Sequence, residues 1–363
     1  MLSGSACCEV KLRTDEKGLF PLKRTGILVI AVGLFLFLLY LYFFVPFGSV
    51  VSIVSQSNPF YYSLAFVAML LSAVFYSLTW QRLLHLLKVK CSFLKTLQFI
   101  WVGSFVDLLI PAESISGEIC RVYLMSRERD ENAGKVVASV IGHRILVMII
   151  TLGALVMSSV YFVIKYNPPM LIMEFVSVIG AATFISIFLL FYLSRKPQAT
   201  DKIVNWVIGL LLKFSRGRWK FEGLKKSAES VLKAFHESID TLTVRPSRLV
   251  LPVSLALISW LLDVLITVFV FFALNARVSF STIVIVYSIT TAVQNIPLGV
   301  PGEIGVLDVF MAILYTSLGV NIVVSAVATV LIRVLTLWTR LLIGGLTVQW
   351  LGIKGFIAEK CVR

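Results

Sequence analysis

Residues 136–164 read VVASVIGHRILVMIITLGALVMSSVYFVI, an apolar run that contains one charged side chain, Arg144. An α-helix rises about 1.5 Å per residue and the hydrocarbon core of a bilayer is about 30 Å thick, so about 20 apolar residues span it. The run exceeds this length. We therefore expect a membrane-spanning helix whose arginine faces a polar partner, because hydrocarbon solvates a guanidinium poorly.

The rest of the chain has the same character. Hydrophobic residues make up 58% of the 363 residues and charged residues only 14%, which is too little charge for the surface of a water-soluble protein. Two apolar stretches, 93–125 and 280–318, are interrupted midway by proline, glycine and acidic residues, so we expect each to form a hairpin of broken helices. Full spans are expected at 26–45, 59–79, 136–164, 170–193, 249–274 and 321–351. The predicted fold class is all-α, a polytopic membrane helix bundle with six full spans and two broken re-entrant hairpins.

Basic residues indicate how such a bundle is oriented. Lys and Arg are clustered in some of the segments between spans, whereas the other loops contain only one each, Lys165 and Arg277. Basic residues near span ends remain on the cytoplasmic side. We therefore expect a multi-pass protein of the cell membrane with both termini in the cytoplasm. The first hairpin would then enter from the cytoplasm and the second from outside. Segments 1–25, 81–135, 195–248 and 353–363 contain 5, 8, 12 and 3 Lys and Arg.

The predicted elements occur twice in the same order. Each copy has two spans, a broken hairpin and a further span, and the copies, residues 26–165 and 166–352, have opposite orientation. Their breaks share letters: Ile110-Pro111 then Gly117-Glu118-Ile119 in the first, Ile296-Pro297 then Gly302-Glu303-Ile304 in the second. Inverted repeats with discontinuous helices are typical of transporters, which favours this interpretation over chance similarity of short Pro-Gly breaks.

Three polar segments flank or interrupt these repeats. Residues 1–25 and 353–363 are basic tails. Residues 195–248 form a polar insert in the second repeat with a helical apolar stripe that includes Phe235 and Ile239. Amphipathic helices on the inner leaflet and a plain cytoplasmic connector both fit this pattern.

The broken hairpins should contain the chemistry of the protein. Irregular backbone at membrane depth is tolerated only where it is buried in protein or lines a water-filled cavity, so each hairpin implies a polar cavity. Glu118 and Arg121 are spaced i, i+3 and could pair. Arg144 and Arg333 could bind a phosphate through paired hydrogen bonds, or could neutralise nearby carboxylates.

The expected substrate-binding residues are Glu113, Glu118, Arg121, Arg144, Asp263, Gln294, Asn295, Glu303, Asp308 and Arg333. Of these, Asp263 lies midway along its span and is a candidate for the same network or for a proton site. The expected helix breaks are at Pro111, Gly117, Pro297, Pro301, Gly302 and Gly305.

Both breaks resemble motifs of the transmembrane domain of the lysylphosphatidylglycerol synthase and flippase family. The first family motif, a proline followed by Gly-Glu-x-x-Arg, is matched by Pro111, Gly117, Glu118 and Arg121. The second, Pro-Gly-Gly-x-Gly with a carboxylate shortly after, is matched by Pro301, Gly302, Gly305 and Asp308, with Glu303 in place of the second glycine. A Glu-Arg pair of the family appears as His143-Arg144.

This resemblance implies movement of a polar-headed lipid between leaflets. The lipid would be an anionic or aminoacylated phospholipid or a polyprenyl-phosphate-linked sugar. The fused synthase domain of some members is absent, so we do not expect this chain to aminoacylate lipid. The leading hypothesis is therefore a lipid flippase or scramblase.

Other classes of function fit less well. The sequence contains no Asp-x-Asp, Gly-rich phosphate loop or His-Glu-x-x-His, so we expect no enzyme, metal or cofactor. The net charge of +14 could suggest a nucleic-acid-binding protein. Such a protein concentrates its basic residues on a folded polar domain, and we find no segment of that kind in the sequence. The remaining alternatives are a membrane scaffold or regulator that recruits a glycosyltransferase or synthase through 195–248, and a small-solute or ion transporter. The expected partners are lipid and such an enzyme, and the oligomeric state stays open.

Overall fold

The computed structural model describes residues 55–110, 115–129, 132–166, 170–202, 206, 221–244, 246–294 and 300–352. Every regular element in these ranges is a helix. The predicted first span, 26–45, and both tails, 1–25 and 353–363, lie outside them.

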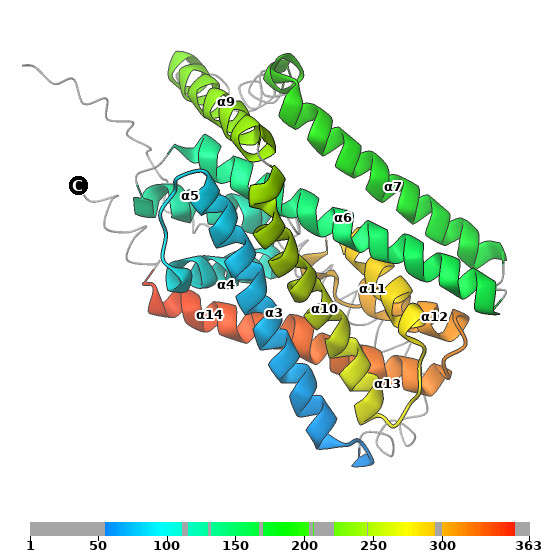
Figure 1. The fold of residues 1–363 in the computed structure, drawn as a ribbon. Helices are drawn as coiled ribbons and strands as arrows, with labels where there is room; N and C mark the ends of the chain where they lie inside the picture. The colour runs from blue at the N-terminus through cyan, green and yellow to red at the C-terminus, as the bar shows by residue number, and fades with distance from the viewer. Residues whose placement is uncertain are drawn as a thin grey trace, which may run out of the picture.

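Five helical segments of the described chain are long and apolar enough to cross a membrane. The all-α polytopic bundle expected from the sequence is therefore confirmed, and Figure 1 shows its long helices running roughly along one direction. The segments are α3 (Pro59–Leu86), α6 (Ala133–Tyr166), α7 (Met170–Arg195), α10 (Val250–Ala273) after the short η1 (Pro246–Leu249), and α13 (Ile322–Arg333) continuing into α14 (Arg340–Trp350).

The last of these segments is not a uniform α-helix. A π-helical stretch, η3 (Val334–Thr339), separates α13 from α14, whereas the sequence predicted one continuous span over 321–351. Short π-helical stretches inside α-helices are frequently found at functional sites. Here the stretch lies between two arginines, Arg333 and Arg340.

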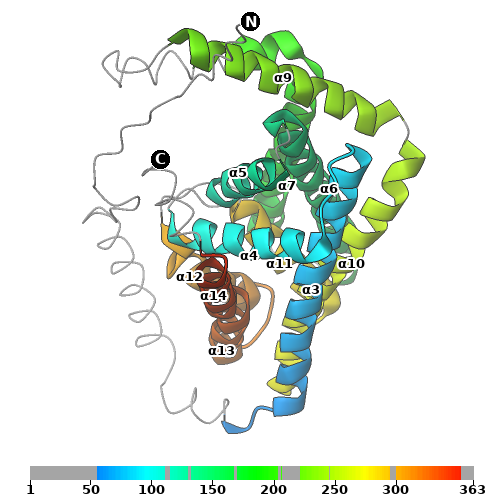
Figure 2. The ribbon, with the colours of Figure 1, turned by 90° about the vertical axis from the view of Figure 1, so that its left-hand side faces the viewer.

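Both interrupted stretches consist of two shorter helices. The first forms α4 (Phe93–Leu109) and α5 (Ser116–Arg129), and the second forms α11 (Phe280–Gln294) and α12 (Val306–Ser317), with η2 (Pro301–Glu303) before α12. The breaks therefore fall where proline and glycine predicted them. Figure 2 shows α4 lying across the bundle beside α3, and α14 packs against it.

Two apolar clusters show which helix ends lie together. One cluster gathers the end of α3, the start of α4, the end of α5 and the start of α6, through Leu84, Phe99, Met125 and Val136. The α4–α5 hairpin therefore begins and ends at the same end of the bundle. The larger cluster gathers the late part of α10, the early part of α11, the late part of α12 and the early part of α13, through Phe271, Ile283, Tyr315 and Val327. The second hairpin begins and ends there.

Helices α3 and α10 pack against each other along their lengths (Figure 1). The Asn58 amide donates to the Ala273 carbonyl at 2.8 Å, so the start of α3 lies beside the end of α10. Near the middle, the Ser259 hydroxyl donates to the Ser72 carbonyl at 3.1 Å. The two helices are therefore antiparallel.

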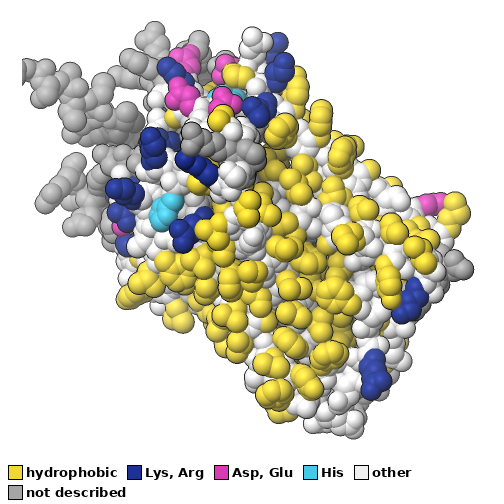
Figure 3. All heavy atoms as spheres, viewed as in Figure 1, with side chains coloured by type: hydrophobic (Ala, Val, Ile, Leu, Met, Phe, Trp, Pro, Cys, Tyr) yellow, Lys and Arg dark blue, Asp and Glu magenta, His cyan; other side chains and the backbone are white. Residues whose placement is uncertain are grey.

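The surface has the distribution expected of a protein in lipid. Figure 3 shows a broad band of hydrophobic side chains across the middle, with Lys and Arg gathered mainly at the upper left end. Helix α7 contributes strongly to the apolar surface, since Phe184, Ile185 and Phe188 are each more than half exposed. Lipid satisfies such side chains without further protein contacts.

The polar insert 195–248 contains α9 (Phe221–Val244). Phe235, Ile239 and Leu242 on this helix are buried in the same apolar cluster as the start of α6. At Gly134 in α6 the helices approach so closely that a β-carbon would collide with the Val231 carbonyl. The second half of α9 thus uses its apolar stripe to pack on the bundle.

Close packing of α14 on α4 provides a test of the fold. A β-carbon at Gly344 would lie 2.7 Å from the Trp101 carbonyl oxygen, whereas one at Gly153 in α6 would meet nothing within 4 Å. We expect Gly344→Ala to lower the thermal unfolding temperature in detergent, because a backbone contact must open; overpacking of this kind costs about 1 to 3 kcal/mol. Gly153→Ala should leave that temperature unchanged or raise it, since alanine favours a helix. Equal behaviour of the two variants would contradict the helix contact.

Candidate functional site

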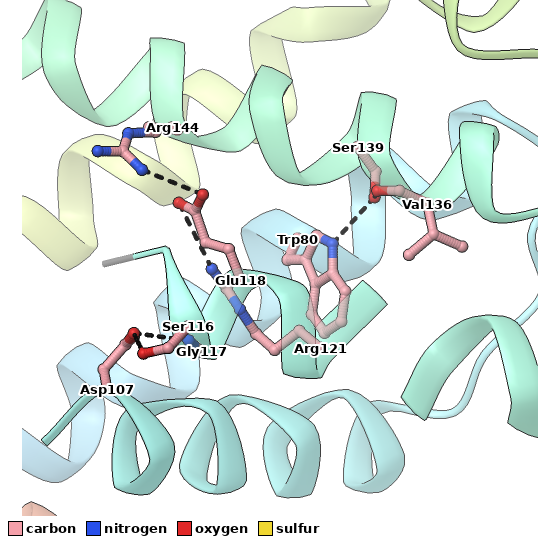
Figure 4. Close-up of polar contacts among 9 residues, drawn as sticks. All are labelled: Trp80, Asp107, Ser116, Gly117, Glu118, Arg121, Val136, Ser139 and Arg144. Carbon is pink, nitrogen blue, oxygen red and sulfur yellow. Dashed lines mark hydrogen bonds and ion pairs between the residues drawn. The ribbon is translucent and has the colours of Figure 1, made fainter. Parts of the chain in front are cut away.

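A carboxylate closes the corner between α4 and α5. Asp107, near the end of α4, accepts hydrogen bonds from the Ser116 hydroxyl at 2.8 Å and from the Gly117 amide at 2.6 Å (Figure 4). The first amides of a helix have no partner within the helix, so Asp107 satisfies one of them and places negative charge at the positive end of α5. Gly117 is required here, because a β-carbon would collide with Asp107 and with the Gly103 carbonyl.

The next residue of α5 joins this corner to the span α6. A carboxylate oxygen of Glu118 lies 3.1 Å from Nη1 of Arg144, and the other lies 3.9 Å from Nη2 of Arg121. The i, i+3 pair expected from the sequence is therefore present, and Glu118 is also the carboxylate partner of Arg144 (Figure 4). The family has a glutamate next to this arginine, and here His143 stands in that position. The carboxylate partner of Arg144 therefore comes from a different helix, as Glu118 of α5.

Arg121 is surrounded by aromatic rings. Its guanidinium lies 5.4 Å from the ring centre of Trp80 and 5.8 Å from that of Tyr76, within the range of cation–π attraction. The indole of Trp80 donates to the Ser139 hydroxyl at 3.0 Å, which fixes the ring against α6 (Figure 4). Arg121 is thus a buried cation whose neighbours are aromatic rings and a carboxylate. The neighbouring His143 is also buried and packs on Tyr76, with 4.1 Å between ring centres.

A similar arrangement occurs at the second break. Asp308 in the first turn of α12 accepts from the Gly305 amide at 2.7 Å and from Nε of Arg333 at 2.9 Å. Arg333 also donates to the Gly302 carbonyl. One carboxylate thus caps a helix start and holds the arginine of a neighbouring span, and that arginine holds the irregular backbone.

The backbone at this break is left-handed at three positions. The φ angles are +59° at Gly302, +49° at Glu303 and +85° at Gly305. Glycine adopts such angles readily, whereas glutamate does so at a cost. The Glu303 side chain is 1% exposed, and its carboxylate oxygens have no hydrogen-bond partner among the described residues. Sequence analysis placed Glu303 in the site, and the structure buries it beside the break.

A third acid–base pair links α10 to α14. Asp263 accepts from the Ser72 hydroxyl at 2.7 Å and from Nη2 of Arg340 at 3.3 Å. Of the two roles considered for Asp263, membership of the arginine–carboxylate network is the one visible in these contacts. Arg340 follows the π-helical stretch and was not among the predicted site residues.

Most of these groups line one cavity of about 330 Å³ inside the bundle, whereas the predicted site residues Glu303 and Asp308 are not among its lining residues. Its wall includes four arginines and three carboxylates from both halves of the chain: Arg121, Arg144, Arg333, Arg340, Asp107, Glu118 and Asp263. Threonines and Gln294 supply further polar groups, and Met148, Ile266 and Leu307 supply apolar wall. The expectation that the two broken hairpins share a polar cavity agrees with this arrangement.

The four arginines differ in how far a ligand could reach them. The side chains of Arg121 and Arg333 are each 8% exposed, whereas those of Arg144 and Arg340 are 17% and 34% exposed. The acids that pair with these two accessible arginines, Glu118 and Asp263, are themselves 21% and 20% exposed. Arg144 and Arg340 are therefore the two arginines that an anion in the cavity can reach most easily.

Sequence reasoning found most of this site but missed part of it. Four predicted residues, Pro111, Glu113, Asn295 and Pro297, lie outside the described residues. Asp107, Arg340, Tyr76 and Tyr287 also line the cavity and were not predicted as site residues. A signal for Arg340 was present, since it follows Arg333 by two helical turns within one apolar span.

Comparison with known proteins bears on this arrangement. Residues 28–344 match the family described as the lysylphosphatidylglycerol synthase TM region. The chain belongs to this family. The family match covers both hairpins and all five described spans except the last turns of α14.

Relatives of similar length occur in archaea. A UPF0104 membrane protein of Methanothermobacter thermautotrophicus is 22% identical over 339 residues, which cover 93% of this chain and 98% of the relative. One from Pyrococcus horikoshii is 24% identical over 328 residues, 90% of this chain and 97% of the relative. The resemblance seen in the two sequence motifs thus extends over nearly the whole chain, and these proteins are membrane proteins by name.

The Arg333–Asp308 pair can be tested for a structural role. Removing one member of a buried ion pair typically costs about 3 to 5 kcal/mol, because the other charge stays buried without compensation. We expect Arg333→Gln to lower the unfolding temperature in detergent strongly, and Asp308→Asn combined with Arg333→Gln to recover much of that loss. The exposed Arg277→Gln serves as the control. A single Arg333→Gln variant as stable as the parent would show that the pair does not stabilise the fold.

Proposed function

We propose that this family member moves a polar-headed lipid between the leaflets of a membrane. The supporting observation is the cavity of about 330 Å³ whose wall combines four arginines with three carboxylates inside a bundle of membrane helices. An ionised phosphate in hydrocarbon would cost tens of kcal/mol by idealised solvation, so its path must replace water with protein groups. The head group would use the cavity while the hydrophobic chains remain in lipid.

Arg144 and Arg340 are the groups best placed to receive a phosphate. Guanidinium binds phosphate oxygens through paired hydrogen bonds, and both side chains reach the cavity. Glu118 and Asp263 would compete with the phosphate for the same N–H groups, which limits how tightly the head group is held. A transporter needs such a limited affinity for the head group, because a lipid that binds too strongly is not released. The fitting substrates are an anionic or aminoacylated phospholipid or a polyprenyl-phosphate-linked sugar.

We further propose that the hairpins are re-entrant and that the two halves form an inverted repeat. Each hairpin begins and ends at one end of the bundle, and the two hairpins use opposite ends. Each break also pairs a capping carboxylate with an arginine network that reaches a later span. With the basic end facing the cytoplasm, both termini would be cytoplasmic in the cell membrane.

Labelling from the two sides of the membrane tests this orientation. Native Cys91 is a poor reporter, because it is buried and burial raises the pKa of its thiol, which leaves less reactive thiolate. In a cysteine-free background we expect Lys90→Cys to react with an impermeant maleimide only from the cytoplasm, and Arg277→Cys only from outside. Both native side chains are exposed. Labelling of both positions from one side would contradict the re-entrant hairpins.

Two other functions would give different results in a transport experiment with the purified protein. A membrane scaffold or regulator that binds a lipid-modifying enzyme through 195–248 would show no transport by itself. A small-solute or ion transporter would move a solute and not lipid. We propose no catalytic activity, metal or cofactor for the cavity, whose ionic groups are arginines and carboxylates.

Transport in proteoliposomes is the direct test. With fluorescent anionic phospholipid or polyprenyl-phosphate sugar in one leaflet, the parent protein should equilibrate the lipid and protein-free vesicles should not. Arg144→Gln and Arg340→Gln should each slow this movement by about tenfold or more, since a hydrogen bond to a charged group contributes about 1.5 to 3 kcal/mol. Arg277→Gln, outside the cavity, should move lipid at the parent rate.

Folding must be checked alongside transport. The variants should elute as single peaks in size exclusion and melt close to the parent, so that slower transport reports the cavity. Full transport by both cavity variants, or the absence of transport by the parent with every lipid tested, would refute the proposal.

A further inference from the structure

A second concave surface lies at the end of the bundle where α3 finishes and α10 begins. This groove has a volume of about 670 Å³ and shares no lining residue with the central cavity. Its wall comes from two short segments that are far apart in sequence and adjacent because α3 and α10 pack together. The lining residues are His85, Leu86, Lys88, Ser247, Arg248, Val250, Leu251 and Ser254.

The polar part of the groove is basic. Lys88 and Arg248 are exposed and line it, and no acidic residue of the described part of the chain does. Neither cation forms an ion pair with a carboxylate of the described residues, unlike the arginines of the central cavity. The hydroxyls of Ser247 and Ser254 add small polar groups. A single negative charge in the groove would therefore meet two uncompensated cations.

Lys88 has an unfavourable backbone conformation. Its φ is +63°, the left-handed region in which glycine usually ends a helix. The amides of Lys88 and Val89 donate to the carbonyls of His85 and Leu84, both at 3.0 Å, so this turn is the end of α3. A lysine here carries a steric cost that glycine would avoid. Such a cost at an accessible cation is consistent with a role for the side chain.

The apolar part of the groove continues along the membrane face of α10. Val250 and Leu251 line the groove and are 64% and 49% exposed. Leu257, Ile258 and Leu261 follow at helical spacing and are 50%, 39% and 42% exposed. In Figure 3, the basic end of the molecule directly borders the yellow apolar band. A molecule in the groove would have its charge at Lys88 and Arg248 and its hydrophobic part along α10.

We propose that this groove is a binding site for an anionic phospholipid of the leaflet in which α3 ends, distinct from the transport cavity. The phosphodiester would lie between Lys88 and Arg248, and an acyl chain would lie along Val250, Leu251 and Leu257. The lining of the groove accounts for both parts of this lipid. The two cations favour a negative head group, and the exposed apolar face of α10 favours an acyl chain embedded in the membrane. The site would hold the ends of α3 and α10 together, because a lipid that binds only the folded protein stabilises it.

Thermal unfolding of the detergent-purified, delipidated protein tests this site. Phosphatidylglycerol should raise the unfolding temperature more than phosphatidylcholine with the same acyl chains, and added salt should reduce the difference. Lys88→Gly should melt as high as the parent or higher without lipid, because glycine relieves the turn. Lys88→Gly and Arg248→Gln should each require about fivefold more phosphatidylglycerol for the same rise, as expected for loss of one cation near a membrane surface.

Matched controls separate this groove from other sources of the effect. Lys90→Gln removes an exposed cation of the same loop, and Arg277→Gln removes one beyond the other end of α10. Neither residue lines the groove or the cavity, so both variants should keep the parent response to phosphatidylglycerol. Unchanged responses of Lys88→Gly and Arg248→Gln would overturn the proposal. So would an equal rise with soluble glycerol phosphate, since the groove would then be an anion site without a lipid. Neither result depends on whether the cavity transports lipid.

Discussion

The structure depends on one constraint: inside a membrane, polar backbone and charged side chains must find their partners within the protein. The helices of both hairpins are interrupted, which leaves backbone amides without partners inside a helix. At each break a carboxylate accepts a hydrogen bond at the start of the next helix. Asp107 caps α5 from the neighbouring helix, and Asp308 caps α12 from its own first turn. One backbone amide at each break, that of Gly117 or Gly305, is therefore bonded to a group that is itself charged. A charge at each break in turn requires a counter-charge, which the bundle supplies as arginine.

The arginine–carboxylate pairs consequently join helices within each half of the chain. Glu118 binds Arg144, Asp308 binds Arg333 and Asp263 binds Arg340, so each pair joins two different helices. The more buried arginine, Arg333, also holds the backbone of a break, which ties the cavity wall to the irregular segment. Arg144 and Arg340 keep part of their surface open to the cavity. Burial thus separates arginines that the sequence alone does not distinguish.

Much of the arrangement could be predicted from the sequence. Long apolar runs predicted the five described spans, and Pro-Gly-acid clusters predicted where the two hairpins break. The i, i+3 spacing predicted the contact between Glu118 and Arg121. Two family motifs predicted membership, which the match over residues 28–344 establishes. Each inference rests on a local property, either apolar length or the spacing of a few residues along one helix.

Pairings between distant elements were not predictable in this way. Which carboxylate lies beside Arg144 was visible only once α5 was seen to place Glu118 there, and Arg340 had no assigned partner until α10 presented Asp263. The π-helical stretch before Arg340 and the groove between Lys88 and Arg248 likewise have no sequence pattern of their own. The sequence by itself determined that the protein lies in lipid, how many apolar runs it has and where its helices break. These features depend on the free energy of transferring each local segment from water into lipid. Only the tertiary structure decided which charges meet, because a partner contributed by another helix depends on how whole helices pack.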